Sequence, residues 1–88
     1  MTTELRWAKD TAVIELDDVV VAALLPDGPV WVLDGAGALL AGRMRGTFTG
    51  EELVDWATGA FDGDQDDIAT GVAKFLATLR DAALVIDA

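Results

Sequence analysis

The chain contains no cysteine, no histidine and no serine. Without cysteine it forms no disulfide and no zinc–thiolate site, and without histidine and serine it cannot build Ser-His-Asp or Cys-His catalytic sites. Carboxylates, lysines and threonines remain, but they are not grouped in a recognisable catalytic motif. Because an active site usually combines titratable groups of complementary types, we expect a protein that is not an enzyme, with no catalytic residues, metal site or cofactor.

Basic residues are also scarce. Six Lys and Arg stand against sixteen Asp and Glu, which gives a formal net charge of −10. Such a charge repels phosphate backbones and anionic lipid, so we expect neither nucleic acid nor membrane as a partner. No apolar run approaches the roughly 20 residues that a membrane span needs, and the start of the chain lacks the pattern of a signal peptide. We therefore expect a cytoplasmic protein.

Hydrophobic residues make up 52% of the 88 residues, enough for one small core, so we expect a single domain over residues 1–88. Three short apolar segments, at 12–16, 19–25 and 30–33, are rich in β-branched residues and predict strands. The turns between them, at 17–18 and 26–29, contain Asp, Gly and Pro. Short turns predict an antiparallel meander in which Leu33 and Trp31 face the same side.

Helical patterns follow the third strand. Asp34 is the expected N-cap of a first helix over about 35–45, with Gly46 as its C-cap. Thr49 and Glu52 have the spacing of a capping box, which predicts the start of a second helix. Gly63 is expected to end that helix.

The third predicted helix is the longest, from an N-cap at Asp64 to about residue 81 or 83. An apolar stripe at helical spacing predicts the buried face of this helix. Gly71 lies in the middle of the helix, where a glycine suggests close packing. Residues 84–86 could add a short extended tail. A three-stranded antiparallel sheet followed by three helices gives an α+β, winged-helix-like fold.

Several patterns invite a more specific function. Asp62, Asp64 and Asp66 match the first ligand positions of an EF-hand loop, but the pattern then fails, and helix capping explains the same carboxylates. Three tryptophans, Trp7, Trp31 and Trp56, could stack on bases, although burial in the core explains them better. The winged-helix order allows a DNA-binding protein, but acidic residues surround the few basic ones on the third helix.

A peptide groove fits the pattern better. By helical periodicity, Ala69, Ala73, Ala77 and Arg80 share one face of the third helix beside the core stripe. The third strand is an edge of the meander unless a later strand pairs with it. An edge strand beside a smooth helical face could bind an extended peptide. The alternative is that these alanines are simply good helix formers.

Four segments resemble, in order, motifs of the PqqD-like peptide chaperones, known as RiPP recognition elements. Residues 5–7 (LRW) resemble the opening strand, and 33–40 (LDGAGALL) resemble the strand-to-helix junction "LN-x-x-GA-x-x-W". Residues 46–53 (GTFTGEEL) resemble "DG-x-x-T-x-x-E-L", and 72–79 followed by 83–85 resemble "V-x-x-FL-x-x-L…GL". Asp34 departs from the usual asparagine and Ala83 from the usual glycine.

This resemblance implies a PqqD-like fold and a non-catalytic role. It implies that the leader of a ribosomally synthesised precursor peptide adds as a strand to the third strand, beside the third helix. The peptide-binding residues that it implies are Val30, Trp31, Val32, Leu33, Ala69, Ala73, Leu76, Ala77 and Arg80.

The partners implied by the resemblance are the precursor leader peptide and a leader peptidase or other modifying enzyme. Composition favours a lasso-peptide B1 protein, which delivers a precursor to a leader peptidase and a cyclase. The alternative within the family is a PqqD-type chaperone for a radical-SAM enzyme. We expect a monomer or a weak homodimer, because an open edge strand could also pair with itself.

Overall fold

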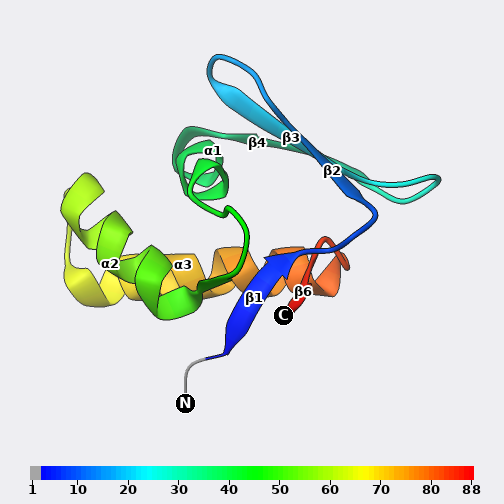
Figure 1. The fold of residues 1–88 in the computed structure, drawn as a ribbon. Helices are drawn as coiled ribbons and strands as arrows, with labels where there is room; N and C mark the ends of the chain where they lie inside the picture. Colours follow the sequence, from blue (N-terminus) through cyan, green and yellow to red (C-terminus); the bar gives the residue numbers. More distant parts are fainter. Residues whose placement is uncertain (1–2) are drawn as a thin grey trace.

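In the computed structural model, which describes residues 3–88, two small antiparallel sheets pack with three helices (Figure 1). The elements in chain order are β1 (Glu4–Trp7), β2 (Thr11–Glu15), β3 (Val19–Leu24), β4 (Val30–Asp34), α1 (Gly35–Gly42), β5 (Phe48–Thr49), α2 (Gly50–Ala60), α3 (Gln65–Asp81) and β6 (Val85–Asp87). One sheet has the order β2-β3-β4 and the other β5-β1-β6. The predicted α+β class and the three-stranded meander are confirmed.

The second sheet joins the two ends of the chain. Leu5 lies opposite both Phe48 of β5 and Asp87 of β6, and Trp7 lies opposite Val85. The predicted extended tail therefore exists, and it pairs with β1 rather than with the meander. This pairing leaves the far side of β4 uncovered by the chain's own tail.

Helix α1 is shorter than predicted. It ends at Gly42, with Arg43 as its C-cap, so the expected C-cap at Gly46 is wrong. Asp34 occupies the N-cap position, but its side chain makes no capping hydrogen bond. Gly35, at φ +53°, begins the helix in the left-handed region. That backbone geometry does not bring the first-turn amides within reach of the carboxylate.

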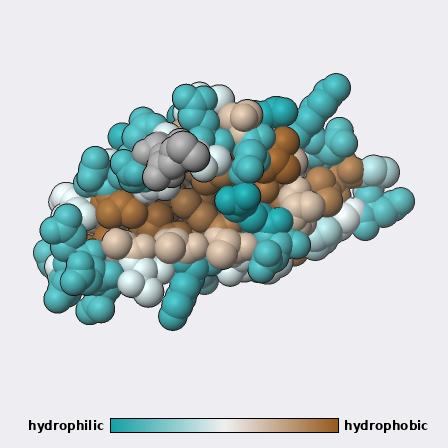
Figure 2. All heavy atoms as spheres, turned by 90° about the horizontal axis from the view of Figure 1, so that it is seen from below, coloured by the Kyte–Doolittle hydropathy of each residue, from teal (hydrophilic) through white to brown (hydrophobic). Residues whose placement is uncertain are grey.

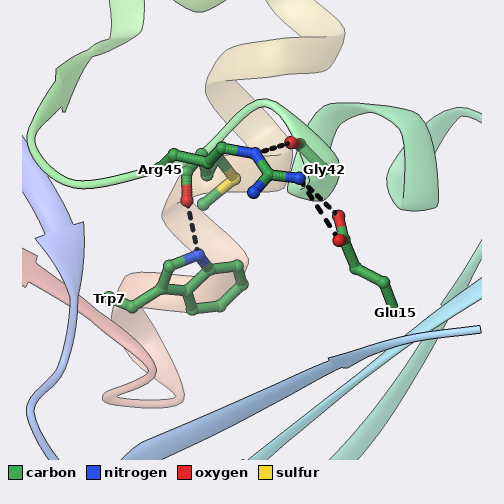
Figure 3. A network of polar contacts seen from close by, with 5 residues as sticks. Trp7, Glu15, Gly42 and Arg45 are labelled. Atoms are coloured by element: carbon green, nitrogen blue, oxygen red, sulfur yellow. Dashed lines mark hydrogen bonds and ion pairs between the residues drawn. The ribbon is translucent and has the colours of Figure 1, made fainter.

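The segment after α1 is held by both sheets (Figure 3). Trp7 of β1 donates a hydrogen bond from Nε1 to the Met44 carbonyl oxygen at 2.9 Å. Arg45 lies 3.3 Å from a carboxylate oxygen of Glu15 in β2 and donates from Nε to the Gly42 carbonyl at 3.1 Å. The exposed Arg45–Glu15 pair connects the meander to this segment, and the Trp7 bond connects β1 to it.

The N-caps of the other two helices agree with the sequence, whereas α2 ends at Ala60 with Phe61 as its C-cap, before the expected Gly63. Glu52 N–H donates to Thr49 Oγ1 at 3.0 Å, and Thr49 N–H donates to Glu52 Oε1 at 3.1 Å, which completes the capping box. Asp64 Oδ1 accepts from the Asp66 amide at 2.8 Å. The close packing expected at Gly71 is wrong, because a Cβ at that position would have no neighbour within 4 Å.

Side chains from both sheets and all three helices form the core. Helix α1 contacts β3 and β4, and α2 packs on α3. In Figure 1, α1 lies between the β2-β3-β4 sheet and the α2–α3 pair. The buried hydrophobic residues among those described are Leu5, Val20, Ala22, Leu40, Ala41, Met44, Phe48, Leu53, Ala57, Val72, Leu76, Leu79, Leu84 and Val85. No helix within residues 3–88 is long and apolar enough to cross a membrane.

The three tryptophans pack against this core, as expected, and each is half-buried. Trp56 also meets Phe61 edge-to-face, with ring centroids 5.7 Å apart, and the Arg43 guanidinium lies 5.2 Å from its ring centroid. These contacts give the rings packing partners within the protein.

Candidate functional site

Strand β4 is the edge of its sheet, and its hydrogen-bonding pattern decides what the edge offers. In antiparallel pairs, residues that bond the partner strand alternate with residues whose N–H and C=O point away from it. Leu24 N–H donates to the Pro29 carbonyl at 3.1 Å, one step before the Ala23–Val30 pair of the register. Along β4, Trp31 and Leu33 therefore form the backbone hydrogen bonds with β3. The N–H and C=O of Val30 and Val32 point to the open side.

The side chains of β4 alternate in the same way. Val30 and Val32 are 67% and 65% exposed, whereas Trp31 and Leu33 are half-buried against the core. The prediction that Trp31 and Leu33 face the same side is confirmed. The edge thus presents free backbone groups from residues whose side chains lie on the outer face of the sheet.

The alanine face of α3 does not lie beside this edge. Ala69, Ala73, Leu76, Ala77 and Arg80 all line one cavity of about 800 Å³. Its other lining residues come from α2, from Leu5 of β1 and from α3 itself, and none belongs to β4. The structure therefore brings the five predicted helical residues together, but it separates them from the predicted strand wall.

Helix geometry explains the separation. With about 100° per residue, the buried stripe at Val72, Leu76 and Leu79 divides α3 into two flanks. Ala73 lies on one flank and Phe75 on the other. The flank predicted from the sequence is the one with small side chains, and it faces α2.

The Phe75 flank is the one near β4. A Cβ placed on Gly37 of α1 would lie 3.4 Å from Phe75 Cε1 and 3.9 Å from Leu33 Cβ, so Gly37 adjoins both. A smaller hollow of about 320 Å³ lies on this side, between α1 and α3. Its lining residues are Ala36, Gly37, Leu40, Phe61, Ile68, Gly71, Val72 and Phe75. The signal in the sequence that could have indicated this flank is Phe75, which lies on the side of the buried stripe opposite the alanines.

Arg80 is paired within the chain. Its Nη2 lies 2.8 Å from Asp87 Oδ1 of β6, and both side chains are about half exposed. The guanidinium is therefore held by an aspartate of the same chain.

No group of three or more Asp and Glu side chains that could hold a metal ion is found among residues 3–88. Asp64, from the calcium-like run, instead caps α3 through its contact with the Asp66 amide.

The family described as coenzyme PQQ synthesis protein D (PqqD) matches residues 12–85, most of the chain. The chain belongs to the PqqD family. Within it, the segment resembling the strand-to-helix junction spans β4 and α1, and the capping-box segment leads into α2. Among curated proteins, no significant match to the sequence was found.

The PqqD-like fold is shared with a solved structure, TbiB1 in complex with the TbiA(beta) leader peptide. The two structures superpose with a TM-score of 0.83, over 91% of this chain and 93% of TbiB1, at 22% sequence identity. At this identity the likeness establishes the fold.

Proposed function

We propose that this PqqD-family protein binds the leader region of a ribosomally synthesised precursor peptide and presents it to a modifying enzyme, without catalysis of its own. The observation that carries the proposal is the open edge of β4, where the N–H and C=O of Val30 and Val32 have no strand partner among the described residues. An extended peptide satisfies these groups by adding to the sheet as another strand.

The strand residues expected from the sequence keep their place in this proposal. Val30 and Val32 supply main-chain hydrogen bonds, while Trp31 and Leu33 set the inward-facing surface next to the new strand. The helical wall changes: we assign it to the Phe75 flank of α3, because Gly37 connects that flank to Leu33. Alternate side chains of the leader would lie against this flank, and their fit gives specificity.

The lasso-peptide role is supported by the fold shared with TbiB1, a protein solved with its leader peptide bound. In that role the enzyme served is a leader peptidase, followed by a cyclase. A PqqD-type chaperone for a radical-SAM enzyme is the second candidate, favoured by the family match itself. The two differ in the enzyme served and share the leader-binding step.

Fluorescence polarisation tests the shared step. The probes are labelled leader peptides of candidate precursors, with a scrambled leader and a labelled DNA duplex as controls. We expect saturable binding of the leader alone. Binding of the duplex without binding of the leader would instead favour the DNA-binding alternative and refute the proposal.

A reconstituted reaction tests delivery. With the precursor whose leader binds, we expect a leader peptidase that acts on this precursor to cleave it faster when this protein is present, and to lose that gain with a scrambled leader. An unchanged cleavage rate, with leader binding intact, would refute delivery to the peptidase.

A further inference from the structure

The larger hollow lies on the flank of α3 that does not adjoin β4. Its surface is mainly apolar: Leu5, Val54, Val72 and Leu76 contribute aliphatic side chains, and Ala69, Ala73 and Ala77 form a row of methyl groups. Seen from below, an apolar strip crosses this part of the molecule, with hydrophilic side chains along both sides (Figure 2). A cavity of about 800 Å³ with such a lining is large enough for several side chains of a partner.

The surrounding backbone decides the form of that partner. Apart from the first-turn amides of α2, helices α2 and α3 satisfy their own backbone groups. Strand β1 is the central strand between β5 and β6. The walls thus offer no row of unpaired N–H and C=O to an extended chain. A helix satisfies its own backbone groups, so it suits these walls better than an extended chain does. This is the opposite of the β4 edge, which suits a strand.

The row of alanines sets the fit. Ala69, Ala73 and Ala77 are spaced by four residues, so the row runs about 12 Å along α3, roughly two helical turns. Methyl-sized side chains let a second helix approach closely, and its apolar residues at i, i+3, i+4 and i+7 can contact the floor between α2 and α3.

The charged residues at the rim of the groove determine which net charge of a partner is favoured. Three carboxylates line the cavity, from Glu51, Asp55 and Asp81. Among the described residues, Arg80 is the only cation that lines the cavity, and it is paired with Asp87 at 2.8 Å. A second copy of this chain would bring a net charge of −10 to an acidic rim, which opposes self-association. A basic ligand is favoured there.

We propose that the α2–α3 groove docks a cationic amphipathic helix of a partner protein. The groove and the β4 edge lie on opposite flanks of α3, so both surfaces can be occupied at once. This docking therefore does not depend on the proposed leader binding, and either can fail alone.

A designed peptide tests the groove directly. The probe is a labelled helical peptide of Leu and Lys, with Leu at i, i+3, i+4 and i+7, and its counterpart has Glu in place of Lys. We expect one-to-one, saturable binding of the Lys peptide in fluorescence polarisation, without displacement of a bound leader. Equal binding of the two peptides would overturn the proposal.

A filling variant and a matched control locate the site. Ala73→Trp fills the groove, and overpacking of this kind predicts an affinity loss of about tenfold or more. Lys74→Trp places the same side chain at an exposed position of α3 that does not line the groove, and it should leave the affinity unchanged. Wild-type affinity in the Ala73→Trp protein would overturn the assignment.

Two double variants distinguish the effect of the rim carboxylates from the effect of the protein's overall net charge. Asp55→Asn with Asp81→Asn removes two rim charges, and Asp17→Asn with Asp27→Asn removes two charges outside the groove. We expect only the first pair to weaken the Lys peptide several-fold and to reduce its salt dependence. Equal effects of the two pairs would show non-specific attraction and overturn the proposal, and these variants also serve if Ala73→Trp does not fold.

Discussion

The Val32→Pro substitution is the sharpest test of the open edge. The Val32 N–H points away from β3, so proline removes no hydrogen bond of the existing ladder. It does remove a donor from the side on which the leader is proposed to bind. Its ring also occupies the space into which the leader backbone would approach.

The expected loss can be worked from the missing bond. A backbone hydrogen bond contributes about 0.5–1.5 kcal/mol net, and a leader carbonyl left buried without a partner costs about 1–3 kcal/mol. A combined loss of about 2 kcal/mol corresponds to a Kd raised about 30-fold. Because the Val32 side chain is 65% exposed, we expect the free energy of unfolding to fall by only about 1 kcal/mol.

The assay pairs leader binding by fluorescence polarisation with urea unfolding of the same variants. Val32→Thr keeps the N–H and the β-branched shape and should bind the leader as the wild type does. Trp31→Pro removes an N–H that bonds β3 and should unfold the meander. A Val32→Pro protein that is folded and binds with unchanged affinity would refute strand addition at β4.

The remaining predictions concern stability, measured as the free energy of unfolding in urea. Thr49→Ala breaks the capping box and should cost about 1 kcal/mol, whereas Asp34→Ala removes no capping bond and should cost less than about 0.5 kcal/mol; equal losses would contradict the cap geometry. Gly71→Ala meets no neighbour within 4 Å in a helix interior and should stabilise by about 0.5–1 kcal/mol. Gly35→Ala should destabilise by about 1 kcal/mol because its φ is +53°, and a gain at this position would argue against the left-handed start of α1. Arg80→Met removes only an exposed ion pair and should change stability by less than about 1 kcal/mol.

Local chemistry made part of the fold predictable. The β-branched segments and the Asp-, Gly- and Pro-containing turns predict the β2-β3-β4 meander, because short turns force neighbouring strands to pair. The capping box at Thr49 and the N-cap at Asp64 predict the starts of α2 and α3, because each cap involves residues two or three positions apart. Asp34 shows the limit: the residue type was right for a cap, but the backbone of Gly35 decided the geometry.

The second sheet and the division of α3 needed the tertiary structure. The sequence indicated extended segments at both ends of the chain, at 5–7 and 84–86, but strands this short do not specify that β1 pairs with β6. Which flank of α3 meets β4 depends on where α1 packs, and the sequence places Ala73 and Phe75 equally well on either side of the buried stripe.

The sequence alone determined a small, acidic α+β domain with an edge strand and no residues for common nucleophilic catalysis, because composition, turn chemistry and helix caps act over a few residues. The tertiary structure alone decided that the tail pairs with β1 and leaves β4 open, and that the alanine row faces α2 instead of that edge. Both outcomes depend on contacts between residues far apart in the chain, whose packing no local pattern specifies.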